Sequence, residues 1–536
     1  MPSTTNYNDT QTLDTTDAQL PITDLAWLTK GAQFPPASQT KRMERYRVNR
    51  ALWKGEHDEV YGDWWKVLRD DKAATLEIVL NWHKRLSTLW ADLLLSETPR
   101  FFDGQDPDRS ADPDSSTEAG PLEAKGSQNA RQEAIDRITS KDDNGYVRTL
   151  YKVALDISRY GDGLVKLSLV EDGARLKAYP PSYWFPVVDP NDLTEFTHHV
   201  LAWKFRRTDM TFLRCEIHHK GRVEHRVYHL EGNMIGEQMP IESFSTIPGG
   251  TQETNLDDFL VVPFKGLEVS DEIFGSNDYE SIDSVIQALE VRCGQINRVL
   301  DKHTDPSMYG PPNLMERDSA GNWVFKAGGR YYEVDEDDVP PGYVTWDGQL
   351  EAQFKEIETL LTQLYILSET SPAAFGQIEG NLAESGSALR RLMQAPLAKV
   401  ARMTMSIDPA AKRCIRLAAQ LEAKNGHATP DITHVNIQWQ DGLPPDPKEQ
   451  AETEHFRKAA LNTSTVSSIR RLDGGTQEEA EAEYARIQAE AQEAADMQMQ
   501  VAEHDAKLKE RQSQASGNTP GKEGAVKTSE KNKETK

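Results

Sequence analysis

The sequence predicts an α+β fold that is mostly helical, and three observations carry this prediction. Apolar residues recur at helical spacing over long stretches of the 536-residue chain. Short alternating apolar and polar runs, separated by turn residues, lie between Leu164 and Phe264, which is typical of antiparallel strands. Two further helical stretches with heptad spacing flank a small module at 304–348.

The acidic composition limits how strongly the chain can bind nucleic acid. Lys and Arg total 61 against 86 Asp and Glu, which gives a formal net charge of −25. Affinity for duplex DNA comes mainly from cationic side chains on phosphates, so a body this acidic should bind DNA poorly but could still surround it. The charge could equally serve solubility alone, and both interpretations stay open.

Cysteine usage and hydropathy indicate a protein made in the cytoplasm. Cys215, Cys293 and Cys414 lie far apart and form no CxxC pair, which argues against disulfides and zinc sites and fits a reducing compartment. The N-terminus is polar and lacks the apolar core of a signal peptide. No stretch approaches the ~18 apolar residues of a membrane span, so we expect no membrane partner.

The N-terminal part of the chain divides into an arm and a folded body. Residues 1–40, rich in Thr, Asp, Pro and Gln, predict a flexible arm with one apolar patch at 25–28. The α+β body spans 41–270 and includes an amphipathic helix whose apolar face runs over 76–93. His83 lies on that face, which favours a packing role over metal binding.

The strand block of this body opens with a predicted β-hairpin, in which 164–170 and 175–179 flank the turn Glu171-Asp172-Gly173. Two histidine pairs, His198-His199 and His218-His219, lie in or beside later strands. Because neighbouring strand residues point to opposite faces, neither pair can readily chelate one metal ion. Further strands are expected at 184–188, 199–206, 212–219, 223–230 and 259–264.

Two long helices follow, at 271–303 and 349–370, on either side of the module at 304–348. In both, apolar residues recur in alternating steps of three and four, the heptad spacing of a packing seam. A hairpin of long helices with a compact tip is the simplest geometry, although two ordinary core helices of one globular domain would show the same spacing. The seam residues are Tyr279, Ile282, Ile286, Leu289, Cys293, Ile296 and Leu300 in the first helix, and Leu350, Phe354, Ile357, Leu361 and Leu364 in the second.

The rest of the chain is predicted to be a glycine-containing loop, further helices and a tail. The loop carries no Lys or Arg. After it we expect a helix kinked by Pro396, a new helix started by Pro409, and a strand. Capping signals then indicate more helix, and a Gly, Ser, Lys and Glu-rich composition indicates disorder at the end. These segments are the loop at 371–386, the helical and strand region at 387–440, the helical region at 441–500 and the disordered tail at 501–536.

A search for catalytic chemistry finds no complete motif. A packaging ATPase would need G-x-x-x-x-G-K-[ST], but the nearest match, from Gly380 to Gly386, has one residue too many and no Lys. There is no H-E-x-x-H zinc motif and no G-x-S-x-G nucleophile elbow. The acidic run at 106–110 is better explained as a solvated loop than as a calcium site. The run at 335–338 is better explained as a solvated turn, or as an acidic patch for a partner, than as a cation site. We therefore predict no catalytic residues, no metal ligands and no cofactor.

Several short motifs, together with the order of the elements, resemble the portal protein family of siphophages. The motifs are Tyr160–Gly163 (YGDG), Val187–Pro190 (VVDP), Thr370–Gly376 (TSPAAFG) and Ser385–Arg390 (SGSALR). The resemblance covers residues 40–500, in the order body, long helix, tip module, long helix, loop and kinked helix.

The resemblance implies a structural subunit, not an enzyme, that assembles into a homo-oligomeric ring of twelve copies at one vertex of a phage capsid. Double-stranded DNA would pass through the ring. Its protein partners would be the terminase, the major capsid and scaffolding proteins, and the head-completion or adaptor proteins. The subunit would be made in the host cytoplasm and reside in the virion. In the family's terms the parts are the wing (41–270 and 387–440), the stem (271–303 and 349–370), the clip (304–348), the tunnel loop (371–386) and the crown (441–500).

The resemblance also assigns candidate roles to particular residues. The apolar stem seams would be covered by neighbouring copies in a closed ring. The tunnel loop would face DNA and touch it by weak polar contacts without an electrostatic trap. The candidate DNA-facing residues are Gln377, Glu379, Asn381 and Glu384.

The clip contributes the last candidates. Its aromatic residues Trp323, Phe325 and Tyr331 could anchor partners, or could equally form the clip's own small core. Two other functions stay open. A minor capsid or scaffolding protein would use the heptads as a coiled coil and form a dimeric or trimeric rod, and a packaging enzyme would need the phosphate or carboxylate motifs that the search did not find.

Overall fold

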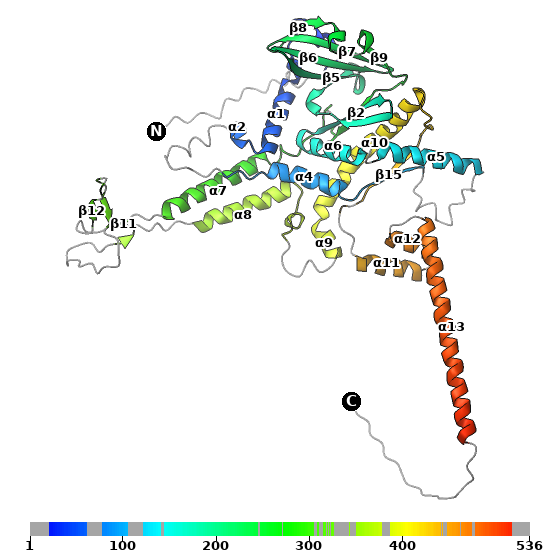
Figure 1. Cartoon of the computed structure of the whole chain (residues 1–536). Helices are drawn as coiled ribbons and strands as arrows, with labels where there is room; N and C mark the ends of the chain where they lie inside the picture. The colour runs from blue at the N-terminus through cyan, green and yellow to red at the C-terminus, as the bar shows by residue number, and fades with distance from the viewer. Residues whose placement is uncertain are drawn as a thin grey trace, which may run out of the picture. The chain divides into compact units, whose positions relative to one another are not determined.

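The computed structural model divides the chain into two compact units, Met1–Leu443 and Pro444–Lys536 (Figure 1). The elements confirm the predicted α+β class, with more helix than strand. The residues that the structure describes are 21–61, 78–104, 122–140, 144–244, 247–270, 272–304, 308–309, 315–317, 319, 321, 323–325, 342–343, 350–377, 386–440, 442, 447–460, 462–473 and 477–516.

The core of the first unit is built around α6 (Tyr146–Tyr160), which turns a strongly apolar face inward. The helices α4 (Trp82–Leu95) and α5 (Leu122–Thr139) contact α6, and α10 (Gln394–Lys424) contacts both of them. The buried Tyr146 hydroxyl donates to a carbonyl of α10 at 2.8 Å. The helix α6 therefore packs against a helix that begins some 250 residues further along the chain.

Two antiparallel sheets belong to this unit, and they include the predicted strands together with β8 and β9, which the sequence did not predict. The smaller sheet has the order β10-β2-β3 and contains the predicted hairpin, in which Val170 pairs with Gly173. The larger runs β4-β5-β6-β7-β8, with β9 beside β7. Their strands are β2 (Asp162–Val170), β3 (Gly173–Ala178), β4 (Trp184–Asp189), β5 (Asp192–Arg207), β6 (Met210–His219), β7 (Arg222–Glu231), β8 (Met234–Met239), β9 (Thr251–Glu253) and β10 (Val261–Lys265). A separate pair joins β1 (Arg100–Asp103) to β15 (Val435–Gln438).

The prediction of a flexible arm over 1–40 is wrong for its second half. Ile22 forms a parallel bridge with Val187, and Leu28 and Phe34 are buried against the six-stranded sheet. The apolar patch at 25–28, noted in the sequence, supplies the contacts that hold this segment down. Single-turn 3-10 helices occur here and elsewhere: η2 (Ala26–Leu28), η3 (Ala37–Gln39), η4 (Pro181–Tyr183), η5 (Ile241–Ser243), η6 (Pro248–Gly250) and η8 (Pro372–Phe375).

Three helix boundaries in the core differ from the predicted ones. The helix expected from residue 76 begins at Trp82, because Asn81 accepts the Lys84 N–H at 3.1 Å and caps it. Pro409 lies inside a continuous α10 and does not start a new helix, since the buried face of α10 holds it together across the proline. The helix after the loop breaks at Met393 and not at Pro396, between α9 (Gly386–Leu392) and α10. Two helices precede α4 in the described chain: α1 (Thr40–Lys54) and α2 (His57–Tyr61).

The two predicted long helices are α7 (Asp283–Thr304) and α8 (Leu350–Leu367), which lie side by side (Figure 1). The first is shorter than the predicted 271–303 at its N-terminal end. Between them the structure describes two small antiparallel pairs. These are β11 (Met308–Tyr309) with β14 (Gly342–Tyr343), and β12 (Met315–Arg317) with β13 (Trp323–Phe325).

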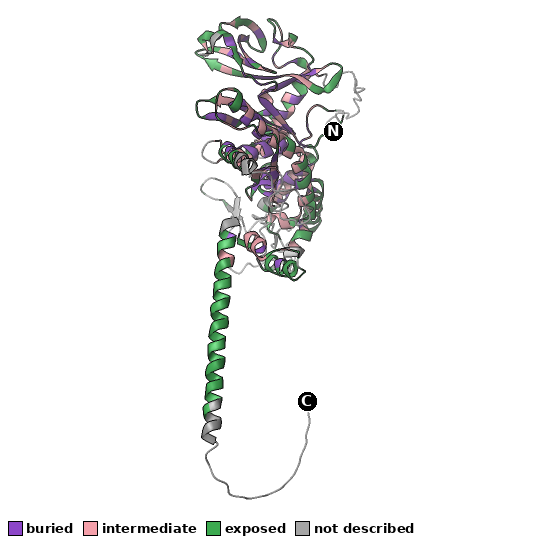
Figure 2. Ribbon diagram, turned by 90° about the vertical axis from the view of Figure 1, so that its right-hand side faces the viewer, coloured by how far each residue is buried: buried purple, intermediate pink, exposed green. Residues whose placement is uncertain are grey.

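The second unit is helical, with α11 (Pro447–Ala459), α12 (Thr465–Asp473) and α13 (Gln477–Ser516). Arg471 of α12 clamps Glu454 of α11 with two hydrogen bonds of 3.0 and 2.9 Å. Figure 2 shows α13 exposed along nearly all of its length. The predicted disorder over 501–536 is wrong for 501–516, because Ala, Glu, Lys and Leu continue the helix up to Ser516. None of the helices in the described residues is long and apolar enough to cross a bilayer.

Candidate functional site

The α7–α8 hairpin is the main candidate site, and its base is buried inside the subunit. Leu86 of α4 packs with the start of α7 and the end of α8 in one apolar cluster. Further along, Arg292 of α7 donates to Glu356 of α8 at 2.8 Å and ties the two helices together. The predicted seam residues that are at most 1% exposed are Tyr279, Ile282, Ile286, Leu289 and Leu364.

This burial corrects the expectation that the whole seam meets neighbouring subunits. A side chain with no exposed surface in a single chain has none left for a second copy. Ile296 is also buried, and Ile357 and Leu361 are partly buried against the same cluster. Phe354 and Leu300 differ, because they are 50% and 46% exposed. The remaining two, Cys293 and Leu350, have intermediate exposure.

Three aromatic rings fix the point where α8 ends and the predicted tunnel loop begins. Trp82 of α4 meets Phe375 edge-on at 5.3 Å and Tyr365 at 6.1 Å between ring centroids. The Arg85 guanidinium lies 5.7 Å from the Phe375 centroid. The exposed Gln377 accepts a hydrogen bond of 3.4 Å from the Tyr365 hydroxyl. The other predicted DNA-facing residues, Glu379, Asn381 and Glu384, lie outside the described residues.

The predicted clip residues fall partly within the described chain. Trp323 and Phe325 lie on β13, where their backbones pair with Arg317 and Met315 of β12. Tyr331 lies outside the described residues. The partner-binding role of these aromatics stays a prediction.

A buried polar cluster at the base of α7 was not predicted from the sequence. Glu290 Oε1 receives a hydrogen bond from the Leu80 N–H at 2.8 Å and lies 2.7 Å from His57 Nδ1. Burial opposes a charge on His57, but the hydrogen bond and charge of Glu290 outweigh it and raise the pKa of this imidazole. The sequence signal was an acidic residue between two apolar ones in the heptad stretch, at Leu289-Glu290-Val291.

A second part of this cluster holds His83, which the sequence singled out as a packing residue. Its Nε2 lies 2.9 Å from Asp283 Oδ1, and the Tyr61 hydroxyl donates to the same oxygen at 2.9 Å. The side chain is fully buried, which agrees with the predicted packing role. Burial lowers the pKa of His83, so this ring is neutral at pH 7.

Hydrogen bonds also connect the chain just before α7 to the helical core. Tyr279 and Ser87 of α4 share a hydrogen bond of 2.9 Å between their hydroxyl groups. Asp278 accepts from Ser158 of α6 at 2.6 Å and pairs with Lys399 of α10 at 2.7 Å. The α7–α8 hairpin is therefore anchored to three core helices by polar contacts as well as by its apolar cluster.

The four strand histidines pair across β5 and β6, a relationship that sequence inspection of each pair did not reveal. His199 lies opposite His218 in the register, and the His198 and His219 rings are 4.6 Å apart on the other face. Among the described residues, no group of three or more His, Cys, Asp or Glu could hold a metal ion.

Comparison with known proteins identifies the family. The sequence model of the family described as "Phage portal protein, SPP1 Gp6-like" matches residues 35–497. No curated protein matches the chain.

Three solved particle structures contain similar chains. One, from the neck of an empty GTA particle computed with C6 symmetry, is 11% identical with a TM-score of 0.42, covering 77% of this chain and 95% of that one. A second, from the virion of a native gene transfer agent particle, is 10% identical with a TM-score of 0.40, covering 73% and 89%. A third, from the neck of a native GTA particle computed with C12 symmetry, is 12% identical with a TM-score of 0.36, covering 66% and 89%.

The family match spans most of the 536 residues and includes the helical core, both sheets, the hairpin and its base. The chain belongs to the phage portal protein family of the SPP1 Gp6-like type.

Proposed function

We propose that the chain forms a twelve-subunit ring around the DNA channel at one vertex of a phage capsid. In this role it docks the terminase during genome packaging, then binds head-completion proteins, and finally serves as the conduit for DNA ejection. It acts as a structural subunit of the virion and catalyses no reaction. Membership of the portal family supports the general role.

The main support for ring formation is the difference in burial between the two ends of the stem hairpin, formed by α7 and α8. Its base is held by the apolar cluster and the polar contacts of Glu290 and Asp283, so the hairpin leaves the core in a defined direction. Further out, half of the Phe354 surface is exposed on α8. Sister copies arranged around an axis would cover such a surface and repeat the contact until the ring closes.

The other parts of the proposal follow from position and charge. Phe375 lies near the start of the proposed tunnel loop at 371–386 and packs on α4, so this end of the loop is fixed in every subunit. A net charge of −25 per subunit suits a channel wall that surrounds DNA without gripping it. The clip at 304–348 is the expected docking region for the terminase and the head-completion proteins.

Electron microscopy of the purified full-length protein tests the proposal. We expect rings with a central hole, and a symmetry count gives the number of subunits. Dimeric or trimeric rods would instead indicate the minor capsid or scaffolding role, and a stable monomer at high concentration would contradict both. An ATPase assay that gave turnover would favour a packaging enzyme.

A further inference from the structure

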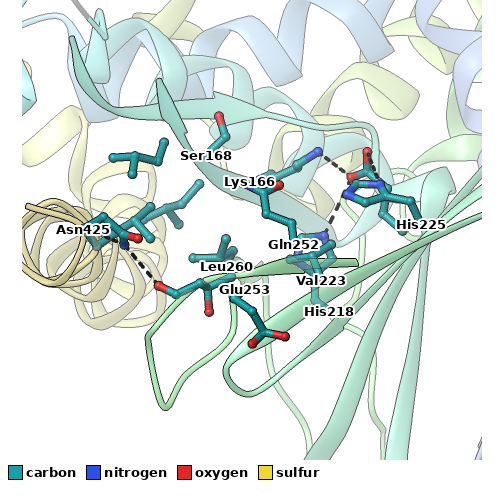
Figure 3. A pocket seen from close by; sticks show the side chains of 14 residues that line it. Lys166, Ser168, His218, Val223, His225, Gln252, Glu253, Leu260 and Asn425 are labelled. Atoms are coloured by element: carbon teal, nitrogen blue, oxygen red, sulfur yellow. Dashed lines mark hydrogen bonds and ion pairs between the residues drawn. The ribbon is translucent and has the colours of Figure 1, made fainter. Parts of the chain in front are cut away.

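A polar pocket lies where the two sheets of the wing meet the end of α10. The strand β2 forms one wall with Lys166 and Ser168, and β6 and β7 form another with His218 and His225. Asn425, which follows α10, closes the far side (Figure 3). The cavity volume is about 80 Å³, enough for several water molecules, since one needs ~10–15 Å³.

Buried ring nitrogens without hydrogen-bond partners face this pocket. His218 has no exposed surface, and neither of its ring nitrogens has a partner among the described residues. Its Nε2 lies 3.8 Å from Glu216 Oε2, which is too long for a hydrogen bond. The Nε2 of His225 is also buried and without a partner in the described part of the chain. Buried polar groups of this kind are normally satisfied by protein or by ordered water.

The hydrogen bond of His225 assigns its tautomer. Arg214 Nη2 donates to His225 Nδ1 at 3.4 Å, so the proton of the neutral ring is on Nε2, which becomes a donor. His218, when neutral, offers one donor and one acceptor. The occupant must therefore both accept and donate hydrogen bonds.

The charged groups that line the pocket are one ion pair and the exposed carboxylate of Glu253. Lys166 and Glu216 form an ion pair in its wall. Burial lowers the pKa of His218, and lowers that of His225 to about 4, so both rings are neutral at pH 7. The Glu216 carboxylate, which a metal ion would need as a ligand, is already paired with the Lys166 ammonium. A small neutral molecule with both donor and acceptor capacity fits better than an ion.

We infer that this pocket is a binding site for a cluster of ordered water molecules that links His218 and His225 of the larger sheet to the β2 strand of the smaller one. Water satisfies a donor and an acceptor with the same oxygen, and it fits a polar space of this size. Bonds through exchangeable water also allow the two sheets to shift slightly without leaving buried groups unpaired. This inference does not depend on ring formation, because every residue involved belongs to one subunit.

A density map of the full-length protein at about 2 Å resolution tests it directly. We expect separate peaks at ~2.7–3.2 Å from the ring nitrogens of His218 and from His225 Nε2. An empty cavity would overturn the inference. So would continuous density of a larger solute, or a peak bound at the ~2.0–2.1 Å of a metal–nitrogen bond.

A pair of variants gives an independent readout. In a hydrated pocket, His218→Phe leaves waters without a partner and lowers the thermal midpoint by about 2–4 °C. In a dry pocket the same change removes unpaired polar atoms and raises the midpoint, which would contradict the inference. His229→Phe, a half-buried histidine on β7 outside the pocket lining, is the matched control and should leave the pocket peaks in place.

Discussion

Gly161 and Gly275 cross so closely that neither position has room for a side chain. A Cβ built on Gly161 would lie 1.9 Å from the Gly275 carbonyl oxygen, and one on Gly275 would lie 2.3 Å from the Gly161 oxygen. This crossing joins the end of α6 to the loop that leads into the stem. Next to it, Asp162 accepts the Gly275 N–H at 3.0 Å and the Tyr46 hydroxyl at 2.7 Å.

Gly161→Ala should therefore destabilise the subunit severely. Its φ of +85° is already unfavourable for other residues, and the added methyl group would meet backbone atoms that cannot rotate away. We expect the free energy of unfolding to fall by more than ~3 kcal/mol, measured by denaturant titration.

Gly232→Ala is the matched control for this prediction. Gly232 also has a positive φ, of +64°, but a Cβ there meets no atom within 4 Å. It should cost about 1–2 kcal/mol, the strain of the left-handed conformation alone. If Gly161→Ala and Gly232→Ala lowered the free energy of unfolding equally, the close approach of Gly161 to Gly275 would add nothing to the cost of the first substitution.

The carboxylate of Glu422 at the end of α10 should make the first unit of the chain sensitive to acid. The side chain is fully buried, pairs with Arg137 and accepts hydrogen bonds of 2.7 Å from both the Ala174 N–H and the Thr429 hydroxyl. Burial raises the pKa of Glu422, but these partners outweigh it and the pKa is lowered. A lowered carboxyl pKa adds stability above the unfolded value of ~4.3, and this stability is lost as the pH falls through the folded value.

We expect Glu422→Gln to lower the free energy of unfolding by about 1–3 kcal/mol at pH 7. The difference from the wild type should shrink steadily below pH ~4.3. Denaturant titrations from pH 3 to 7 measure both effects. Glu44→Gln, which breaks an exposed pair with Arg47 on α1, is the control and should change little at any pH. A Glu422→Gln penalty as large at pH 3 as at pH 7 would contradict the ionic argument.

The His57–Glu290 pair should give the base of the stem the opposite pH dependence. A raised histidine pKa adds stability that is fully present below the unfolded value of ~6.5 and is lost as the pH rises through the folded value. Glu290→Gln removes the charge that favours protonated His57. We expect it to lower the free energy of unfolding by about 1–3 kcal/mol at pH 6, and by less at pH 9.

Titrations between pH 6 and 9 check this prediction. The other titratable groups that face the pair are Asp283, His83 and Tyr61, and Glu290→Gln leaves them in place. Glu280→Gln is a suitable control, because Glu280 forms a half-exposed ion pair with Arg45 and contacts no histidine in the described structure. An identical pH profile for wild type and Glu290→Gln would rule out the proposed coupling.

Local patterns predicted the elements well because their causes are local. The predicted turn Glu171-Asp172-Gly173 connects β2 to β3, as a tight hairpin requires. Gly173 has a φ of +130°, a conformation that favours glycine. Alternating apolar residues marked β6 and β7, and heptad spacing marked α7 and α8. In each case the periodicity reflects which side of one element is buried.

The environment of each element could not be predicted in this way. The heptad seam of α7 indicated that Ile286 and Leu289 would be buried, but gave no sign that α4 of the same subunit would bury them. The same holds for His199 and His218, whose pairing depends on the register of two strands. Contacts between distant segments follow from the whole core, which a periodic pattern in one segment does not describe.

The stem gives the sharpest test of which seam residues meet a neighbour. Leu364 is fully buried in the subunit, so Leu364→Ala should lower the free energy of unfolding by ~2–5 kcal/mol. Phe354 is half exposed on the same helix, so Phe354→Glu should leave the helical content and the stability of the isolated subunit nearly unchanged. In the proposed ring, however, the new carboxylate would be buried against the next copy, and a buried unpaired charge is strongly unfavourable.

We therefore expect Phe354→Glu to abolish rings in electron micrographs and to give a folded, smaller species in analytical ultracentrifugation. Leu364→Ala should have the opposite effects. It should lower the stability of the subunit, but the molecules that remain folded should still form rings. Normal rings from Phe354→Glu would mean that this face of α8 lies outside the contact between copies. The ring would then have to close through other surfaces, because the base of the stem is already occupied by its own subunit.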